Sequence, residues 1–200
     1  MKNPERTPTN ERTQLSIDTS FDQLIYVLHE GNIPIDEYGT GAAKTVEHLL
    51  NEIHEEESII SVDSKGTVHR TLRVVWIDVL CTLSNGQTYR LKEDRQEFKD
   101  GRTRKRVLQS SLGEKLKATE DANTTVYRAA QEELGIQSLE KVEHIDDEEE
   151  TYVSGTYPGI QSTYAIHKYV AVIHESDFKP EGYVEHQSDK SNYYIWQPVD

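Results

Sequence analysis

Acidic side chains recur around a single arginine in residues 113–136, GEKLKATEDANTTVYRAAQEELGI. Residues three and four positions apart share one face of a helix, so Glu132 and Glu133 are expected to project close together. Arg128 lies four residues before Glu132, at a spacing that allows an ion pair to hold that carboxylate. Ala129 stands one turn earlier, at a position where a third carboxylate would complete the cluster. This arrangement indicates a cation site with one ligand missing.

A divalent cation is the partner that such a cluster requires. Carboxylates that are gathered and desolvated without a counter-ion repel one another and become partly protonated. Mg²⁺ prefers oxygen ligands, bridges to phosphate oxygens and lowers the pKa of a bound water. We therefore expect Mg²⁺ or Mn²⁺ as the cofactor, held by Glu132 and Glu133 on the helix and by Glu120 in the loop before it.

The same segment resembles the Nudix box, whose pattern is G-x5-E-x7-R-E-U-x-E-E-x-G-U with U an aliphatic residue. Six positions match in register, and they are Glu120, Arg128, Glu132, Glu133, Gly135 and Ile136. Two positions depart from the pattern. Glu114 falls where the opening glycine is expected, and Ala129 replaces the glutamate after the arginine, which in the family is usually a metal ligand or a base for the attacking water.

The resemblance implies an α/β fold in which a mixed β-sheet is sandwiched between helices. It also implies a metal-dependent hydrolase that cleaves the diphosphate of a nucleoside diphosphate linked to another moiety. Glu132, Glu133 and Arg128 would then be catalytic, with Arg128 orienting the cluster. The alternative is a weakened module that binds a nucleotide or another protein, because Ala129 supplies no carboxylate.

A residue outside the segment could replace the missing carboxylate. Glu185 is one candidate, because it precedes the expected terminal strand, and His167 is a second. Each has a simpler interpretation. Glu185 would be a charge in a surface loop, and His167 a histidine on a sheet without a special task.

Two further segments could contact a nucleotide-like diphosphate ligand. Residues 98–106, FKDGRTRKR, are basic in an otherwise acidic chain, and Arg104 and Arg106 would share one face if the segment is extended. Tyr157 could stack on a base. The alternatives are a solvated loop for the first segment and, for Tyr157-Pro158-Gly159, a type II turn.

Hydrophobic periodicity and turn residues predict the elements that must position these side chains. A helix over 21–30 should begin at Ser20, and the central helix should begin at Asp121 and end at Gly135. The other expectations are an amphipathic helix within 42–58, strands at 59–63, 67–83, 87–93, 139–145, 163–174 and 193–199, and a polar loop over 145–151.

Composition limits the remaining function classes. The formal net charge of −14 would repel long nucleic acids, and we expect no membrane association. Cys81 is the single cysteine, which leaves no disulfide framework and favours a reducing, cytoplasmic location. The eight histidines are scattered, without an H-x-x-x-H or Cys/His pairing that would indicate zinc.

The chain is expected to divide into three parts. Residues 1–16 are polar and suggest a disordered tail. Residues 17–58 would form a helical extension, which is not part of the minimal Nudix fold and is a candidate surface for a homodimer. Residues 59–200 would form the Nudix-like domain.

Overall fold

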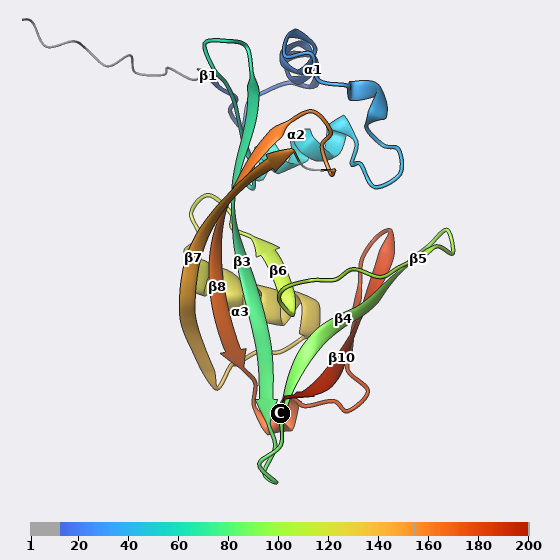
Figure 1. Cartoon of the computed structure of the whole chain (residues 1–200), viewed down its shortest axis with the longest axis vertical. Coiled ribbons are helices and arrows are strands. Elements are labelled where there is room, and N and C mark those ends of the chain that lie inside the picture. Colours follow the sequence, from blue (N-terminus) through green and yellow to red (C-terminus); the bar gives the residue numbers. More distant parts are fainter. Residues whose placement is uncertain (1–12, 154, 200) are drawn as a thin grey trace, which may run out of the picture. The chain divides into compact units, whose positions relative to one another are not determined.

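The computed structural model describes residues 13–153 and 155–199, which form two compact units (Figure 1). The first unit comprises the chain up to Leu72 together with Glu150–Tyr164. The second comprises Arg73–Glu149 and the residues from Ala165 onward. The division expected from the sequence, at 16/17 and 58/59, remains a prediction, and residues 1–12 of the expected tail lie outside the described residues.

The first unit contains the two N-terminal helices. Helix α1 spans Phe21–Glu30 and α2 spans Val46–His54. Ser20 caps α1 as predicted, because its hydroxyl accepts a hydrogen bond from the Gln23 backbone N–H while the Gln23 side chain bonds back to Ser20. Thr45 caps α2. This second helix ends before the acidic run that follows it, because negative charge at a helix C-terminus opposes the helix dipole.

Short strands complete the first unit. Strand β1 (Thr13–Gln14) pairs with β2 (Ile59–Val62), which pairs with the beginning of β3 (Val68–Thr82), all antiparallel. The predicted hairpin is therefore confirmed. Helical and strand residues share one core, formed by Leu24, Leu28, Ile33, Val46, Leu49, Ile53, Ile60, Val68, Tyr157 and Ile160.

The second unit is built on a sheet with helix α3 against it. Its remaining elements are β4 (Thr88–Phe98), β5 (Thr103–Arg104), β6 (Leu112–Lys115), α3 (Ala122–Leu134), β9 (Tyr183–His186), β10 (Lys190–Val199) and most of β7 (Lys141–Val153) and β8 (Gln161–Val172). The end of β7 and the beginning of β8 belong to the first unit. Strand β4 lies between β3 and β10, and β9 follows β10. Strand β3 also pairs with β6 and β8, and β8 pairs with β7. The predicted α/β class is confirmed.

Helix α3 begins and ends where the sequence predicts. The Asp121 carboxylate accepts a hydrogen bond from the Thr124 backbone N–H, and Gly135 adopts the left-handed conformation with φ of 72°. The buried face of α3 packs into the core of the second unit together with alternate residues of β3, among them Cys81, which is fully buried. This packing fixes the rotation of α3 about its axis, and with it the directions in which Glu132 and Glu133 project.

The predicted polar loop over 145–151 is wrong, because these residues lie inside strand β7. Pairing with β8 satisfies the backbone of this acidic segment, while its charged side chains remain exposed to water. Strand preference depends on such context more than on residue type. Strand β9 was not predicted, and β4 extends five residues beyond its predicted end. None of the helices in the described residues is long and apolar enough to cross a membrane.

Candidate functional site: a carboxylate cleft beside helix α3

Arg128 on α3 binds three of the acidic side chains that the sequence placed together. Its Nε and Nη2 donate to the two carboxylate oxygens of Glu120, both at 2.9 Å. Its Nη1 lies 3.1 Å from Glu114 Oε1 and 3.1 Å from Glu132 Oε2. Burial alone would lower the pKa of Arg128, but these carboxylates raise it. Arg128 therefore fixes the loop before α3 onto the helix, as a positioning residue.

Glu120 is fully engaged by this arrangement. Besides the two bonds from Arg128, its Oε2 accepts from the Thr125 hydroxyl at 3.1 Å and from the Lys117 backbone N–H at 3.2 Å. The Arg128 guanidinium is the main reason that the pKa of Glu120 is lowered to about 2. The Arg128 guanidinium binds both oxygens and offsets their charge, so a structural role explains Glu120 better than metal ligation, which remains a prediction.

This pKa predicts a pH dependence of folding. Because the pKa of Glu120 lies below its usual 4.5, its stabilisation is complete above that value and is lost as pH falls toward about 2. We expect the urea midpoint of unfolding to fall over this acid range. The Glu120→Gln variant should start from a lower midpoint and show a shallower acid dependence. Parallel pH profiles for the two proteins would contradict the assignment.

Ala129 is fully buried in the core of the second unit. Its methyl group packs among apolar side chains, so the position where the Nudix pattern has a carboxylate provides only hydrophobic contact here. Glu132, three residues later, has 56% of its side chain exposed and is paired with Arg128. Neither residue lines the cleft described next.

Glu133, unlike Glu132, lines a cleft of about 170 Å³ in the second unit. Its Oε2 accepts a hydrogen bond of 2.5 Å from the Tyr194 hydroxyl. Its Oε1 is buried and has no hydrogen-bond partner among the described residues. Burial, and then the negative charges of Glu185, Glu114 and Glu93, raise the pKa of Glu133 to about 8, against the opposing effect of Tyr194.

Four carboxylates and two cationic side chains line this cleft. The acidic residues are Glu93, Glu114, Glu133 and Glu185, and the cationic residues are Arg106 and Lys190. Their formal charges leave the cleft acidic, which favours a cation and disfavours a bare phosphate. The buried, unpartnered Oε1 of Glu133 fits a hard divalent cation, because such ions bind carboxylate oxygens and offset the cost of desolvating them.

The register of three neighbouring strands brings Glu185 into the cleft. Gln96 on β4 lies opposite Asn192 on β10, which lies opposite Glu185 on β9. Gln96 Nε2 donates to Asn192 Oδ1 at 2.9 Å, and Asn192 Nδ2 donates to Glu185 Oε2 at 2.5 Å. Gln187 Nε2 donates to Glu185 Oε1 at 2.6 Å. This row of amides orients Glu185, which the sequence offered either as a replacement for the missing carboxylate or as a charge in a surface loop.

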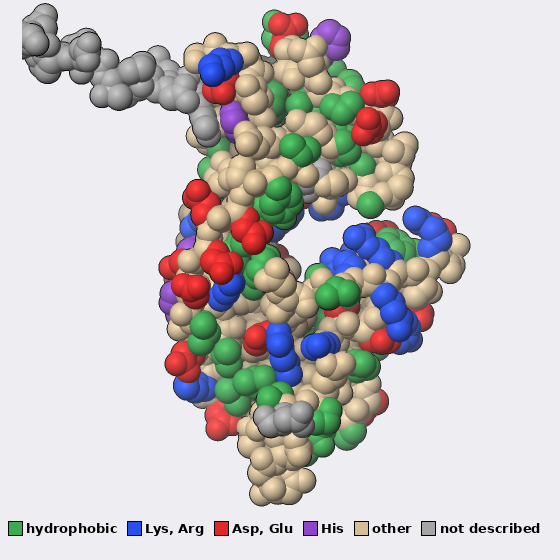
Figure 2. All heavy atoms as spheres, in the orientation of Figure 1, with side chains coloured by type: hydrophobic (Ala, Val, Ile, Leu, Met, Phe, Trp, Pro, Cys, Tyr) green, Lys and Arg blue, Asp and Glu red, His purple; other side chains and the backbone are tan. Residues whose placement is uncertain are grey.

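The basic segment places Arg106 at the cleft and Arg104 away from it. Arg106 forms a two-pronged ion pair with Glu93, with Nε 2.8 Å from Oε1 and Nη2 bonded to Oε2. Arg104 is exposed on β5 and does not line the cleft. Figure 2 shows Lys and Arg side chains gathered over β4, β5 and β10. Lys190 on β10 also lines the cleft, and burial lowers its pKa.

Tyr157 belongs to the first unit, where it is fully buried. Its ring centroid lies 5.9 Å from that of Tyr38, and the Arg70 guanidinium lies 5.0 Å from its centroid. Gly159 has φ of 82°, as the third residue of a type II turn requires. The ring therefore helps to form a core, and its suggested stacking on a base has no support from this burial.

His167 does not line the cleft, and it contacts Asp147 on the neighbouring strand β7. Of the ionisable residues that line the cleft, Glu93, Glu114, Lys190 and Tyr194 were not assigned from the sequence. Alternation was the available signal for two of them, since Lys190, Asn192 and Tyr194 share one face of β10. The pairing of β10 with β4 and β9 could not be predicted from the sequence alone.

Comparisons with solved structures find several Nudix proteins. An Ap4A hydrolase from C. elegans is 13% identical over 63% of this chain and 79% of its own, with a TM-score of 0.37. A MutT/nudix family protein from Enterococcus faecalis is 18% identical over 65% and 44%, with a TM-score of 0.42. The Nudix domain of Shewanella oneidensis NrtR, complexed with ADP ribose, is 14% identical over 64% and 73%, with a TM-score of 0.37. No protein-family model and no curated protein matches the chain.

Proposed function

We propose that the protein is a Nudix-like, metal-dependent hydrolase that cleaves the diphosphate of a nucleoside diphosphate linked to another moiety. The observation that carries this proposal is the buried, unpartnered Oε1 of Glu133 in a cleft with three other carboxylates. The six matching positions of the Nudix pattern support it. The proposed location is cytoplasmic, in keeping with one buried, unpaired cysteine.

Glu133, Glu185 and Glu114 would hold the Mg²⁺ or Mn²⁺. When bound, the cation supplies charge neutralisation for phosphate oxygens and lowers the pKa of a water. Glu185 stands in for the carboxylate absent at 129, since its amide neighbours orient it into the cleft. It would accept the proton of the attacking water. The ligand roles of Glu120 and Glu132 remain predictions, and the Glu132→Gln variant in the Discussion separates the role of Glu132 from that of Glu133.

Arg106 and Lys190 would bind the diphosphate. The planar Arg106 guanidinium can bind two phosphate oxygens at once, although in this structure it is paired with Glu93. The cationic side chains share the cleft with the carboxylates, so a phosphate bridging to the cation would lie within reach of both. Arg104 is exposed on the same edge and is proposed only as a peripheral contact.

An assay with a panel of nucleoside diphosphate compounds tests this function. The full chain is incubated with Mg²⁺ or Mn²⁺, and the released phosphate species are measured. We expect turnover that requires the cation and that is lost in Glu133→Gln. Thermal stabilisation by a compound without any turnover would instead support the second candidate, a nucleotide-binding module, which the burial of Ala129 in the core favours.

Cation binding in the cleft should release a proton. Glu133 has a pKa of about 8, so its carboxyl is mainly protonated at pH 7, and a cation on Oε1 requires the ionised form. Calorimetry of Mg²⁺ binding in two buffers of different ionisation enthalpy should give release of about one proton per cation. Glu133→Gln provides the control, with no such release. Equal enthalpies in both buffers for the wild type would contradict the prediction.

A further inference from the structure

Two histidines and an aspartate converge on the outer surface of the second unit, away from the residues of the carboxylate cleft. Asp147 Oδ1 lies 2.9 Å from His144 Nε2 and 2.6 Å from His167 Nδ1. One potential ligand atom from each residue lies within 4.8 Å of the other two. Their side chains are 45%, 60% and 29% exposed for His144, Asp147 and His167, so a solvated ion can reach them.

The backbone of β7 brings the side chains of His144 and Asp147 together. His144 and Asp147 are three residues apart on β7, and regular alternation would place them on opposite faces of the strand. The two side chains nevertheless contact each other, with His144 Nε2 2.9 Å from Asp147 Oδ1, so β7 departs from regular alternation here. The His144 ring is also held edge-on by Tyr169 on β8, with centroids 5.2 Å apart.

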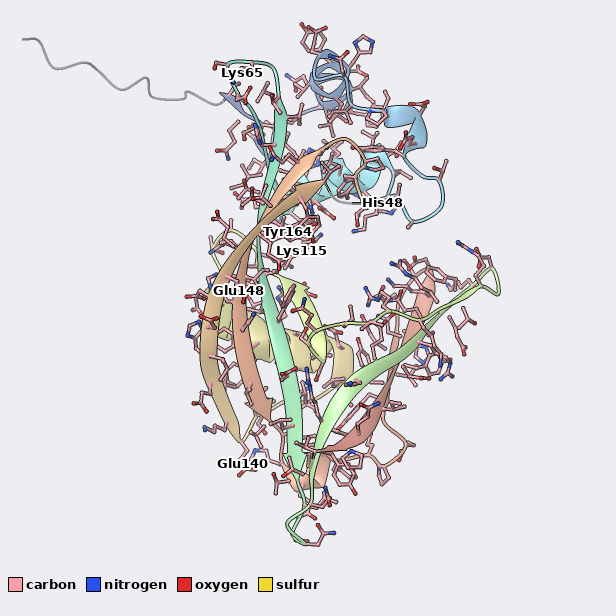
Figure 3. All side chains as sticks on the ribbon, viewed as in Figure 1. His48, Lys65, Lys115, Glu140, Glu148 and Tyr164 are labelled. Atoms are coloured by element: carbon pink, nitrogen blue, oxygen red, sulfur yellow. The ribbon has the colours of Figure 1, made fainter. Side chains whose placement is uncertain are left out.

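The donor set determines which cations fit. Two imidazole nitrogens and one carboxylate oxygen suit borderline divalent ions such as Zn²⁺, whereas Mg²⁺ favours oxygen donors alone. The surrounding strand is acidic, with exposed side chains from Asp146 to Glu149, and Figure 2 shows histidine and acidic side chains side by side along β7. Glu148, marked in Figure 3, pairs with Lys168 at 2.5 Å.

We propose that His144, Asp147 and His167 bind one zinc-class divalent cation at a site separate from the carboxylate cleft. The ion would replace the hydrogen bonds that now join the three residues and would link β7 to β8. Three protein ligands leave a coordination position for water or for a further ligand from solution. The sequence indicated no zinc, because His144 and His167 are 23 positions apart and only the β7–β8 pairing unites them.

Zinc titration of the full chain in excess Mg²⁺ tests the proposal. Excess Mg²⁺ saturates oxygen-only sites, so the remaining Zn²⁺ binding seen by calorimetry reports the histidine site. We expect one Zn²⁺ per chain, with affinity reduced at least about tenfold in His144→Ala and in His167→Ala. The wild-type protein gives a second measurement, since the imidazole NMR signals of both histidines should shift together on Zn²⁺ addition.

Two control variants make the outcome specific. His29→Ala removes an exposed histidine from α1 in the first unit, and Glu133→Gln removes the central carboxylate of the cleft. Both should bind Zn²⁺ as the wild type does. The proposal is overturned if Zn²⁺ fails to bind in excess Mg²⁺, if the two histidine variants retain wild-type affinity, or if Glu133→Gln abolishes binding. Because the sites share no residue, failure here leaves the proposed hydrolase untouched.

Discussion

Replacing Glu133 by glutamine should lower the rate of diphosphate hydrolysis by about 10²–10⁴-fold, because the cation loses its buried ligand. This is the range that loss of a catalytic acid or base produces. The amide has nearly the shape of the carboxyl and still accepts the Tyr194 hydrogen bond, so the fold is preserved. Above pH 8 the variant should even unfold at a higher temperature, because it avoids burying an ionised carboxylate. Steady-state kinetics with saturating Mg²⁺ provide the measurement.

Glu132→Gln is the matched comparison, one residue along the same helix. Its side chain is more than half exposed and belongs to the Arg128 cluster rather than the cleft, so we expect its rate to change only a few-fold. If Glu132→Gln abolishes turnover while Glu133→Gln retains it, the cation binds to the outer carboxylates and the cleft is not the site.

Replacing Arg128 by alanine should reduce the free energy of unfolding by about 3 kcal/mol, because it leaves three carboxylates without their common partner. Glu120 loses both of its bidentate bonds in a largely buried position, with 17% of its side chain exposed. Urea unfolding followed by tryptophan fluorescence suits this test, because Trp76 and Trp196 both lie in the second unit.

Arg102→Ala controls for the simple loss of a positive charge. Its partner is Asp100, and both side chains are mostly exposed, at 65% and 53%. Exposed pairs of this kind contribute about 0.2–1 kcal/mol, so this variant should unfold close to the wild type. Arg128→Lys should fall between the two, since it keeps the charge but cannot form the fork to Glu120. Equal destabilisation by Arg128→Ala and Arg102→Ala would contradict the proposed positioning role.

The sequence predicted those parts of the fold that local chemistry determines. Ser20 and Asp121 cap helices, and Gly135 ends one, because short polar side chains and a residue without Cβ satisfy helix termini wherever they occur. Spacing on α3 also correctly placed Arg128 beside Glu132. Whether Glu132 or its neighbour faces a cleft depends on how the helix is rotated against the sheet, and spacing alone does not fix that.

The parts that were missed depend on pairing between distant strands. Glu185 was a candidate from the sequence, but its position in the cleft depends on strand β9, which was not predicted, and on the pairing of β9, β10 and β4, which aligns it with Asn192 and Gln96. The acidic segment of β7 was assigned to a loop because its composition is polar, although β8 satisfies its backbone. The same error left Asp147 in a loop, and the approach of His144 to His167 could not be predicted without the pairing of β7 with β8.

Cys81 is the only thiol in the chain, and it is fully buried, where burial raises its pKa. A protonated, inaccessible sulfur reacts slowly with maleimides and other alkylating reagents. A cysteine introduced at an exposed position, such as Glu148, can therefore be labelled selectively in the otherwise native protein. A fluorophore at that position would report Zn²⁺ arrival at β7 without background from the native residue.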